Sequence, residues 1–233
     1  MKVRIAKFIA DSGVTSRRGA EQLIAAGAVS VNGVVIDTPV HFVDDTDEVK
    51  IKGKTIAKRT DTKLYAFNKP IDTVTTTHDP RGRNTIYDIL PLEYRNLRYV
   101  GRLDYKTTGL LLMTNDGLFA RRLTQPDSNI PRVYLADVAG NNMSKLDKAR
   151  QGVVIDGIKY RPMQIEVMRD RRLRVTVTEG KKNEIRIVLK YCGLPVKKLH
   201  RIMYGPISVK NIPSGKIVEV DKKTIDALIE SFL

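Results

Sequence analysis

Tryptophan is absent from this sequence of 233 residues, cysteine occurs once and histidine three times. A single cysteine excludes an internal disulfide and any zinc site built from several thiolates. Cys192 stands between Tyr191 and Gly193, and we expect it to be a buried packing thiol rather than a nucleophile. Because the histidines are scattered and the chain has no glycine-rich phosphate loop, the sequence predicts neither a metal site nor a cofactor.

Long apolar runs are lacking as well. No stretch of the sequence is long enough to span a bilayer, and residues 1–13 contain no apolar core of a signal peptide. A basic amphipathic helix of the kind that binds membrane surfaces is not evident either. These absences predict a cytoplasmic protein that does not bind membranes.

Acidic residues are the minority among the charged ones. The chain has 26 Asp and Glu against 41 Lys and Arg, which gives a net charge of +15 and a pI near 9.9. Such a charge indicates a polyanionic partner, and nucleic acid fits best because the basic residues are spread along the chain. Apolar residues make up 42% of the sequence, which is enough for a real hydrophobic core.

The first 55 or so residues have the pattern of a small unit of helices and strands. Apolar residues recur at helical spacing in residues 3–12, and a second helix is predicted over residues 17–26. Asn32-Gly33 is a strong hairpin turn between two short apolar strands. This arrangement resembles the S4 RNA-binding domain. The residues that carry the resemblance are Ser16-Arg17-Arg18, Ala20, Leu23-Ile24, Gly27 and Val29-Ser30-Val31-Asn32-Gly33.

Three cations of this region are candidates for contacts to RNA. Arg17 and Arg18 lie at the predicted start of the second helix, where backbone amides also favour phosphate, and Lys7 lies on the first helix. The alternative is a basic accessory unit whose charges are only solvated. Residues 54–63 are polar and basic without an apolar period, and we interpret them as a linker. The predicted domains are therefore residues 1–60, with the linker, and residues 61–233.

The most informative stretch of the second domain is GRLDYKTTGLLLMTNDG, residues 101–117. Its pattern predicts a loop with one acid, Asp104, between a strand at 98–101 and a buried strand that contains the apolar block 110–113. From the pattern alone, the alternative is a surface loop whose aspartate caps a neighbouring residue. Upstream, strands are predicted at Leu64–Phe67 and Thr73–Thr77.

Residues 101–117 resemble the catalytic motif of the pseudouridine synthases, specifically the RsuA-type branch that modifies ribosomal RNA. The resemblance implies that Asp104 is the catalytic carboxylate of an isomerase that turns a uridine of ribosomal RNA into pseudouridine without a cofactor or metal. It also implies an α+β fold, with a small N-terminal S4-like domain and a larger domain. The larger domain would be built on a mixed, mostly antiparallel sheet with a catalytic cleft.

Two further motifs resemble this branch. Arg132 and Tyr134 match a basic-X-Tyr pattern, which implies that the tyrosine packs against the target base. Residues 179–186, EGKKNEIR, resemble a motif in which a helix opens with a basic residue directed at the catalytic aspartate, here Arg186. The family more often carries glutamine where Glu184 stands.

Other residues follow from the same resemblance. Ile185 and Leu199 are expected in the wall of the pocket, and Arg102 would fill the space that the flipped-out base leaves. Arg81 and Arg83 belong to a loop rich in turn residues and suit phosphate contact, with a solvated turn as the alternative.

The expected partner is ribosomal RNA, either free or in a pre-ribosomal particle. Residues 201–206 favour the large subunit over the small one, and a monomer is expected because family members act alone. Two alternatives come from other classes of protein. A non-catalytic S4-type RNA-binding or ribosome-assembly protein would explain the charge but not Asp104, and a hydrolase would need a second acid beside it.

Overall fold

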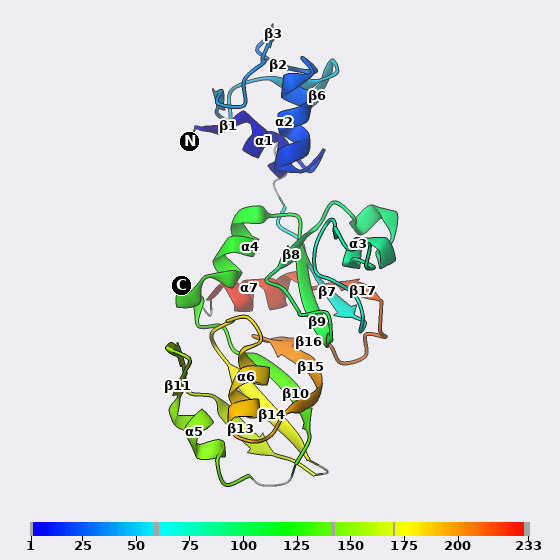
Figure 1. Cartoon of the computed structure of the whole chain (residues 1–233). Helices are drawn as coiled ribbons and strands as arrows, with labels where there is room; N and C mark the ends of the chain where they lie inside the picture. Colours follow the sequence, from blue (N-terminus) through cyan, green and yellow to red (C-terminus); the bar gives the residue numbers. More distant parts are fainter. Residues whose placement is uncertain (1, 58–60, 141–142, 170, 231–233) are drawn as a thin grey trace. The chain divides into compact units, whose positions relative to one another are not determined.

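The computed structural model describes residues 2–57, 61–140, 143–169 and 171–230 (Figure 1). The chain divides into two compact units. The first comprises Met1–Lys63 with the short segments Asn96–Arg98 and Asn115–Gly117, and the second comprises the rest. The predicted boundary at residue 60 lies outside the described residues. None of the helices in these ranges has both the length and the apolar character needed to cross a membrane.

The first unit pairs two helices with short antiparallel strands. Its elements are β1 (Val3–Arg4), α1 (Ile5–Asp11), α2 (Arg17–Ala25), β2 (Val29–Val31), β3 (Val34–Val35), β4 (Phe42–Val43), β5 (Val49–Ile51) and β6 (Lys54–Ile56). The Ser16 side chain caps α2 by accepting a hydrogen bond from the Gly19 amide at 3.1 Å. Asn32 and Gly33 have φ of 50° and 83°, as the tight turn between β2 and β3 requires.

Apolar side chains from both helices and from the strands form the core of this unit. Ile5, Ile9, Ile24, Val29 and Val49 are all fully buried in it. The predicted linker is wrong over its first three residues, because β6 pairs with β5 in the sheet order β3-β2-β5-β6. None of the side chains of β6 is buried. The strand therefore lacks the alternation of apolar and polar residues by which a strand is predicted from sequence.

The second unit contains the remaining elements, except that the first residues of β8 and α4, Arg98 and Gly117, belong to the first unit. They are β7 (Leu64–Lys69), α3 (Ile86–Ile89), η1 (Leu92–Tyr94), β8 (Arg98–Val100), β9 (Thr107–Thr114), α4 (Gly117–Thr124), η2 (Pro126–Ser128), β10 (Arg132–Val138), α5 (Leu146–Gln151), β11 (Val153–Ile155), β12 (Ile158–Tyr160), β13 (Gln164–Val167), β14 (Arg172–Val177), α6 (Glu184–Tyr191), β15 (Val196–Tyr204), β16 (Ile207–Ser208), β17 (Ile217–Glu219) and α7 (Lys222–Glu230).

One large sheet organises the second unit. Its main path runs β13-β14-β10-β15-β9-β7-β17, and β15 pairs with β9 in parallel while the other pairs on this path are antiparallel. Gly109 permits the parallel contact, because a Cβ there would lie 2.3 Å from the carbonyl oxygen of Arg201. The mixed, mostly antiparallel sheet and the N-terminal S4-like unit confirm the predicted α+β class.

The apolar block of the central stretch is the middle of the sheet. Leu110 and Leu112 of β9 are fully buried and pack with Phe119 of α4 and Leu228 of α7. The prediction of a buried strand after the loop with Asp104 is confirmed. Cys192 is also buried, as expected of a packing thiol.

Residues 73–77 do not form the predicted strand. Only Val74 makes a bridge, to Thr85, and the Ile86 amide donates to the Val74 carbonyl at 3.0 Å. The run of β-branched residues suggested a strand, but the segment bonds to residues 84–86 and to the loop that carries Asp104.

Candidate active site

A pocket of about 960 Å³ opens in the second unit. Its walls come from the loop between β8 and β9, from β10 and β15, from the segment after β14 and from the first turn of α6. Six of the residues selected from the sequence line it, namely Arg102, Asp104, Arg132, Tyr134, Ile185 and Leu199. Neighbouring strands of the sheet thus bring these distant parts of the chain together.

Asp104 lies in the loop of residues 101–106, which begins at Gly101 with a φ of 66°. The Thr107 amide donates to the Asp104 carbonyl at 2.9 Å and closes a turn at the aspartate. The side chain is half-buried. Within the described residues its carboxylate accepts no hydrogen bond and has no ion-pair partner within 4.0 Å. An acid whose backbone is fixed and whose carboxylate makes no hydrogen bond or ion pair within the described residues is available to a ligand.

Arg186 lies in the first turn of α6, where the sequence predicts a cation directed at Asp104. Its guanidinium donates to the carbonyls of Val196 at 3.1 Å and Lys106 at 3.2 Å. Burial lowers the pKa of Arg186, and the charge of Asp104 opposes that shift. Arg186 therefore interacts with Asp104 through charge and holds the end of its loop. No direct ion pair joins the two side chains in the described structure.

Tyr134 lies on β10 and is 9% exposed. Its hydroxyl accepts a hydrogen bond from Nη1 of Arg201 at 3.4 Å, and that guanidinium lies 5.9 Å from the centre of its ring. Arg201 is only 2% exposed, and its Nε donates to the Leu110 carbonyl at 2.6 Å. A buried arginine of β15 thus fixes the tyrosine. Arg201 is not among the site residues that the sequence predicts, because its basic and apolar neighbours give no sign of burial.

Arg132, which precedes Tyr134 in the predicted motif, supports the same wall of the pocket. It is nearly buried and donates to the Thr178 carbonyl and the Tyr204 hydroxyl, both at 3.0 Å. Its guanidinium lies 4.9 Å from the centre of the Tyr204 ring. Neither Arg132 nor Arg201 has a carboxylate within 4.0 Å among the described residues. Two buried positive charges therefore favour an electron-rich or anionic ligand in this pocket.

Lys69 is a further buried cation that the sequence does not predict as a site residue. It ends β7, is fully buried, and donates to the carbonyls of Pro70 at 3.0 Å and Thr107 at 2.9 Å. Burial lowers the pKa of Lys69 to about 8, while the charges of Asp104 and Asp72 act in the opposite direction. The only signal in the sequence was the Lys-Pro pair that opens the second domain, and it did not show what the side chain contacts.

The carboxyl groups of Glu179 and Glu184 both belong to the pocket wall, and each shifts the pKa of the other. Burial, followed by the contact with Glu179, raises the pKa of Glu184 to about 8. Glu179 also accepts hydrogen bonds from the Arg161 amide at 2.7 Å and from the Lys181 ammonium group. Glu184 therefore keeps its proton to higher pH than an ordinary glutamate, whereas the pKa of Glu179 is lowered, because the effect of burial is outweighed by its hydrogen bonds.

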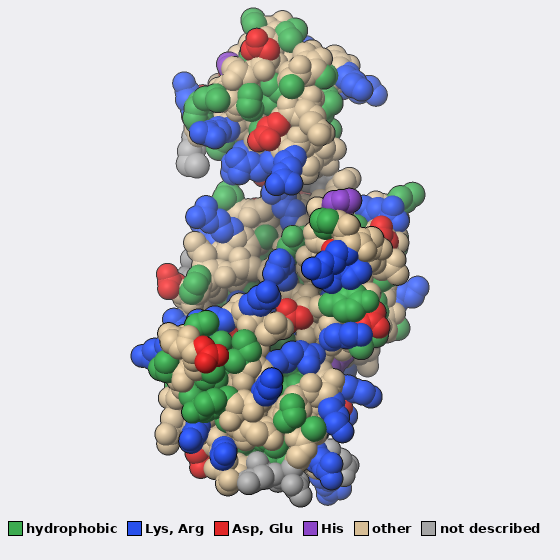
Figure 2. Space-filling model, viewed as in Figure 1, with side chains coloured by type: hydrophobic (Ala, Val, Ile, Leu, Met, Phe, Trp, Pro, Cys, Tyr) green, Lys and Arg blue, Asp and Glu red, His purple; other side chains and the backbone are tan. Residues whose placement is uncertain are grey.

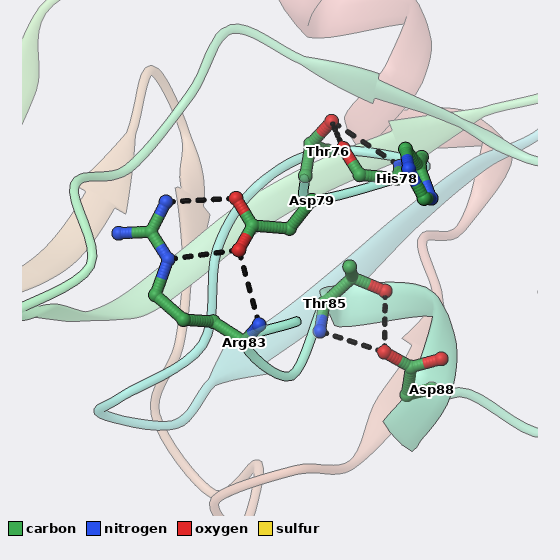
Figure 3. A network of polar contacts seen from close by, with 6 residues as sticks. All are labelled: Thr76, His78, Asp79, Arg83, Thr85 and Asp88. Carbon is green, nitrogen blue, oxygen red and sulfur yellow. Dashed lines mark hydrogen bonds and ion pairs between the residues drawn. The ribbon is translucent and has the colours of Figure 1, made fainter. Parts of the chain in front are cut away.

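The loop with Arg81 and Arg83 lies before α3. Nε and Nη2 of Arg83 donate to the two carboxylate oxygens of Asp79 at 2.9 and 2.8 Å (Figure 3). This contact holds the pKa of Asp79 well below its usual range. The Arg83 guanidinium also lies 5.5 Å from the centre of the Tyr105 ring. Arg83 is therefore engaged within the protein, whereas Arg81 is exposed.

The three cations selected in the first unit also differ from one another. Arg17 and Arg18 are exposed in the first turn of α2. Lys7 instead forms an ion pair of 2.5 Å with Asp11, one turn further along α1. The helix start thus offers two exposed positive charges beside free backbone amides, and Lys7 is partly neutralised.

Lys and Arg side chains spread over the face of the second unit that Figure 2 shows, with few acidic side chains between them. Such a surface suits a polyanion. In the described part of the chain, no group of three or more His, Cys, Asp and Glu side chains is placed to hold a metal ion.

Comparison with known proteins bears directly on this site. The model of the S4 domain matches residues 3–49, and the model of RNA pseudouridylate synthase matches residues 63–191. An uncharacterized RNA pseudouridine synthase of Rickettsia conorii is 37% identical over 227 residues, which span 96% of this chain and 98% of that protein. This chain belongs to the RNA pseudouridylate synthase family.

Two further similar proteins are also pseudouridine synthases by name. Ribosomal large subunit pseudouridine synthase B of Vibrio cholerae is 35% identical over 242 residues, which span 99% of this chain and 75% of that protein. A crystal structure of a pseudouridylate synthase matches with a TM-score of 0.69 and 25% identity, over 97% of this chain and 99% of that chain. The predicted family, the enzyme class of pseudouridine synthase and the S4 domain are thereby confirmed.

Proposed function

We propose that this pseudouridine synthase converts one uridine of large-subunit ribosomal RNA to pseudouridine, with Asp104 as its catalytic carboxylate. The observation that carries the proposal is Asp104 itself, an acid on a fixed loop in the pocket of a family member, whose carboxylate makes no hydrogen bond or ion pair among the described residues. The name of the relative from Vibrio cholerae, which aligns with 99% of this chain, supports the large subunit as the source of the RNA.

The reaction needs little beyond such a carboxylate. The bond between ribose C1′ and uracil N1 breaks, the uracil turns, and C1′ is joined to C5, while C5 loses a proton and N1 gains one. No atom or electron is gained or lost overall, so one group that acts as nucleophile or base suffices. Asp104 would attack the ribose, attack the uracil or remove a proton. The cations of Arg186 and Lys69 stabilise negative charge beside it.

The target base must leave its stack to reach the pocket, which costs a few kcal/mol. In this proposal Tyr134 lies against the uracil face, and such stacking contributes about 1–3 kcal/mol. Arg102, which is exposed at the mouth of the pocket, fills the space that the base vacates. Ile185 and Leu199 provide apolar wall.

The S4 unit and the surface loops would hold the rest of the RNA. Arg17 and Arg18 contact phosphates from the start of α2, and Arg81 does so from its loop. Lys7 and Arg83 are weaker candidates, because each already pairs with an aspartate. We further propose a monomer that acts in the cytoplasm on free ribosomal RNA or on an assembly particle.

Release of tritium from C5-labelled uridine in a fragment of large-subunit ribosomal RNA tests the proposal. The isomerase should release tritium while the base stays attached to the RNA. A non-catalytic S4-type protein would bind the fragment and release none, and a hydrolase would free the base. Equal release from a small-subunit fragment would contradict the preference for the large subunit.

A further inference from the structure

The loop that carries Asp104 is held at every peptide from residue 103 to residue 107. Each of these five carbonyl oxygens accepts a hydrogen bond from a different group. In order along the chain, the donors are the Thr75 hydroxyl (2.9 Å), the Thr107 amide (2.9 Å), the Asp72 amide (3.1 Å), the Arg186 guanidinium (3.2 Å) and the Lys69 ammonium (2.9 Å). The backbone on both sides of the aspartate is therefore fixed by other parts of the second unit.

Thr75 makes two of the contacts that hold this loop. Its hydroxyl donates to the Leu103 carbonyl at 2.9 Å and accepts from the Leu103 amide at 3.3 Å. Thr75 is 6% exposed and Leu103 is 5% exposed, so water does not replace either hydrogen bond readily. A single side chain thus fixes both polar groups of the residue that precedes Asp104.

The segment that carries Thr75 is itself braced. The Val74 amide donates to the Asn84 carbonyl at 2.9 Å, and the pair of Asp79 and Arg83 closes the loop between them (Figure 3). Thr85, which caps α3, adds the bridge to Val74. The Thr75 hydroxyl therefore stands on a fixed segment and not on a mobile one.

We infer that Thr75 is a positioning residue of this enzyme, whose hydroxyl holds the Leu103–Asp104 peptide in the orientation that the chemistry requires. The inference rests on the proposed role of Asp104. Thr75 does not line the pocket, so it acts through the loop and not on the substrate. Displacing a reacting group by about 1 Å costs up to about 100-fold in rate, and losing both hydrogen bonds allows such a displacement.

The test compares Thr75→Val with Thr73→Val in the full-length protein. Valine has nearly the shape of threonine but no hydroxyl. Thr73 is a matched control, because it is 2% exposed in the same segment but its hydroxyl donates to the Ile71 carbonyl at 3.2 Å, away from the loop with Asp104. Both variants lose one buried hydroxyl, and only one of them loses contact with Leu103.

Tritium release is measured for both variants across RNA concentrations, together with hydrogen exchange of the Leu103 amide. We expect Thr75→Val to lower kcat by about 10- to 100-fold with KM within about 3-fold, and to speed exchange at Leu103. Thr73→Val should match the wild type in kcat and in the exchange rate of the Leu103 amide. A normal kcat for Thr75→Val, an equal loss in both variants, or a change confined to KM would overturn the inference.

A second pair keeps the test decisive if Thr75→Val does not fold. Thr75→Ser retains the hydroxyl and Thr75→Ala removes it, while both lose the methyl group. Serine should keep kcat within about 3-fold and alanine should lose about 10-fold or more. Equal values for the two would contradict the inference. If the wild-type protein releases no tritium, the proposed function is wrong. That outcome differs from failure of the inference on Thr75, in which the wild type is active and the variants do not differ as expected.

Discussion

The two units of this protein use their positive charges in different ways. In the first, Arg17 and Arg18 are exposed at the start of α2, beside backbone amides that also favour phosphate. In the second, Lys69, Arg132 and Arg201 are each less than 10% exposed and donate to carbonyls or tyrosine hydroxyls. The second unit also has exposed cations, such as Arg81 and Arg102, but among the residues compared only its buried cations build and support a pocket.

The net charge of the chain therefore counts exposed and buried cations together, although they differ in function. Only exposed cations release counterions when they meet RNA, so only they contribute to salt-dependent binding. Buried cations fix the backbone and the aromatic rings around Asp104. Changes at the pocket should alter kcat, whereas changes at the start of α2 should alter KM and its dependence on salt.

The largest effect is expected for Asp104→Asn. The substitution keeps the shape of the side chain but removes the carboxylate, and we expect kcat to fall by more than about 100-fold. Affinity for the ribosomal RNA fragment should stay within about 3-fold of the wild type, because a carboxylate adds nothing to phosphate binding. Filter binding and tritium release measure the two quantities. Residual turnover above about a hundredth of the original would assign the chemistry to another residue.

Arg186→Met should have the next largest effect, a fall in kcat of about 10- to 100-fold with KM little changed. Methionine fills the space but loses the charge beside Asp104 and the hydrogen bond to the Lys106 carbonyl. Arg186→Lys is the control, and it should recover about tenfold because it restores the charge. Steady-state tritium release measures all three proteins. A wild-type kcat for Arg186→Met would show that Arg186 does not contribute to catalysis through the loop that carries Asp104.

A smaller effect is expected from Glu184→Gln, in stability rather than in turnover. The pKa of Glu184 is raised to about 8 in the folded protein, above its ordinary value of 4.5, so the folded state loses stability relative to the unfolded one as pH rises between those values. The loss is at most about 1.4 kcal/mol per pH unit. Glutamine cannot ionise, so the free energy of unfolding of the variant should rise relative to that of the wild type as pH increases from 5 to 8.

Urea unfolding at several pH values measures this difference. Lys69 does not obscure it, because a lysine pKa lowered to about 8 affects stability mainly above that pH. A constant difference between Glu184→Gln and the wild type from pH 5 to 8 would show that Glu184 is already ionised at neutral pH.

The parts of the fold that local patterns encode were predictable from the sequence. Helical spacing and the Asn32-Gly33 turn identified the first unit, and the motif around Asp104 identified the family. Each of these signals lies within a few consecutive residues, so no knowledge of the rest of the fold was needed.

The remaining features depend on contacts between distant segments. β15, with the sequence VKKLHRIMY, reads as mixed basic and apolar, and its role follows from pairing with β9 and β10. Lys69 and Thr75 bind backbone carbonyls, which every residue carries, so their partners leave no trace in the sequence. The ion pair of Arg83 with Asp79, four residues earlier, was not predicted, because a loop of turn residues and cations does not show which side chains meet.

The division of labour between the units is tested most directly by the salt dependence of catalysis in Arg17→Ala/Arg18→Ala. A charge-matched control is Lys222→Ala/Lys223→Ala, which removes two exposed lysines from α7. For the first variant we predict an unchanged kcat and a plot of log KM against log salt that is flatter by about 1.4–1.8, or about 0.7–0.9 for each lost phosphate contact. The control should keep the wild-type slope. A lower kcat with an unchanged slope would contradict the account, because the first unit would then support the pocket instead of binding RNA.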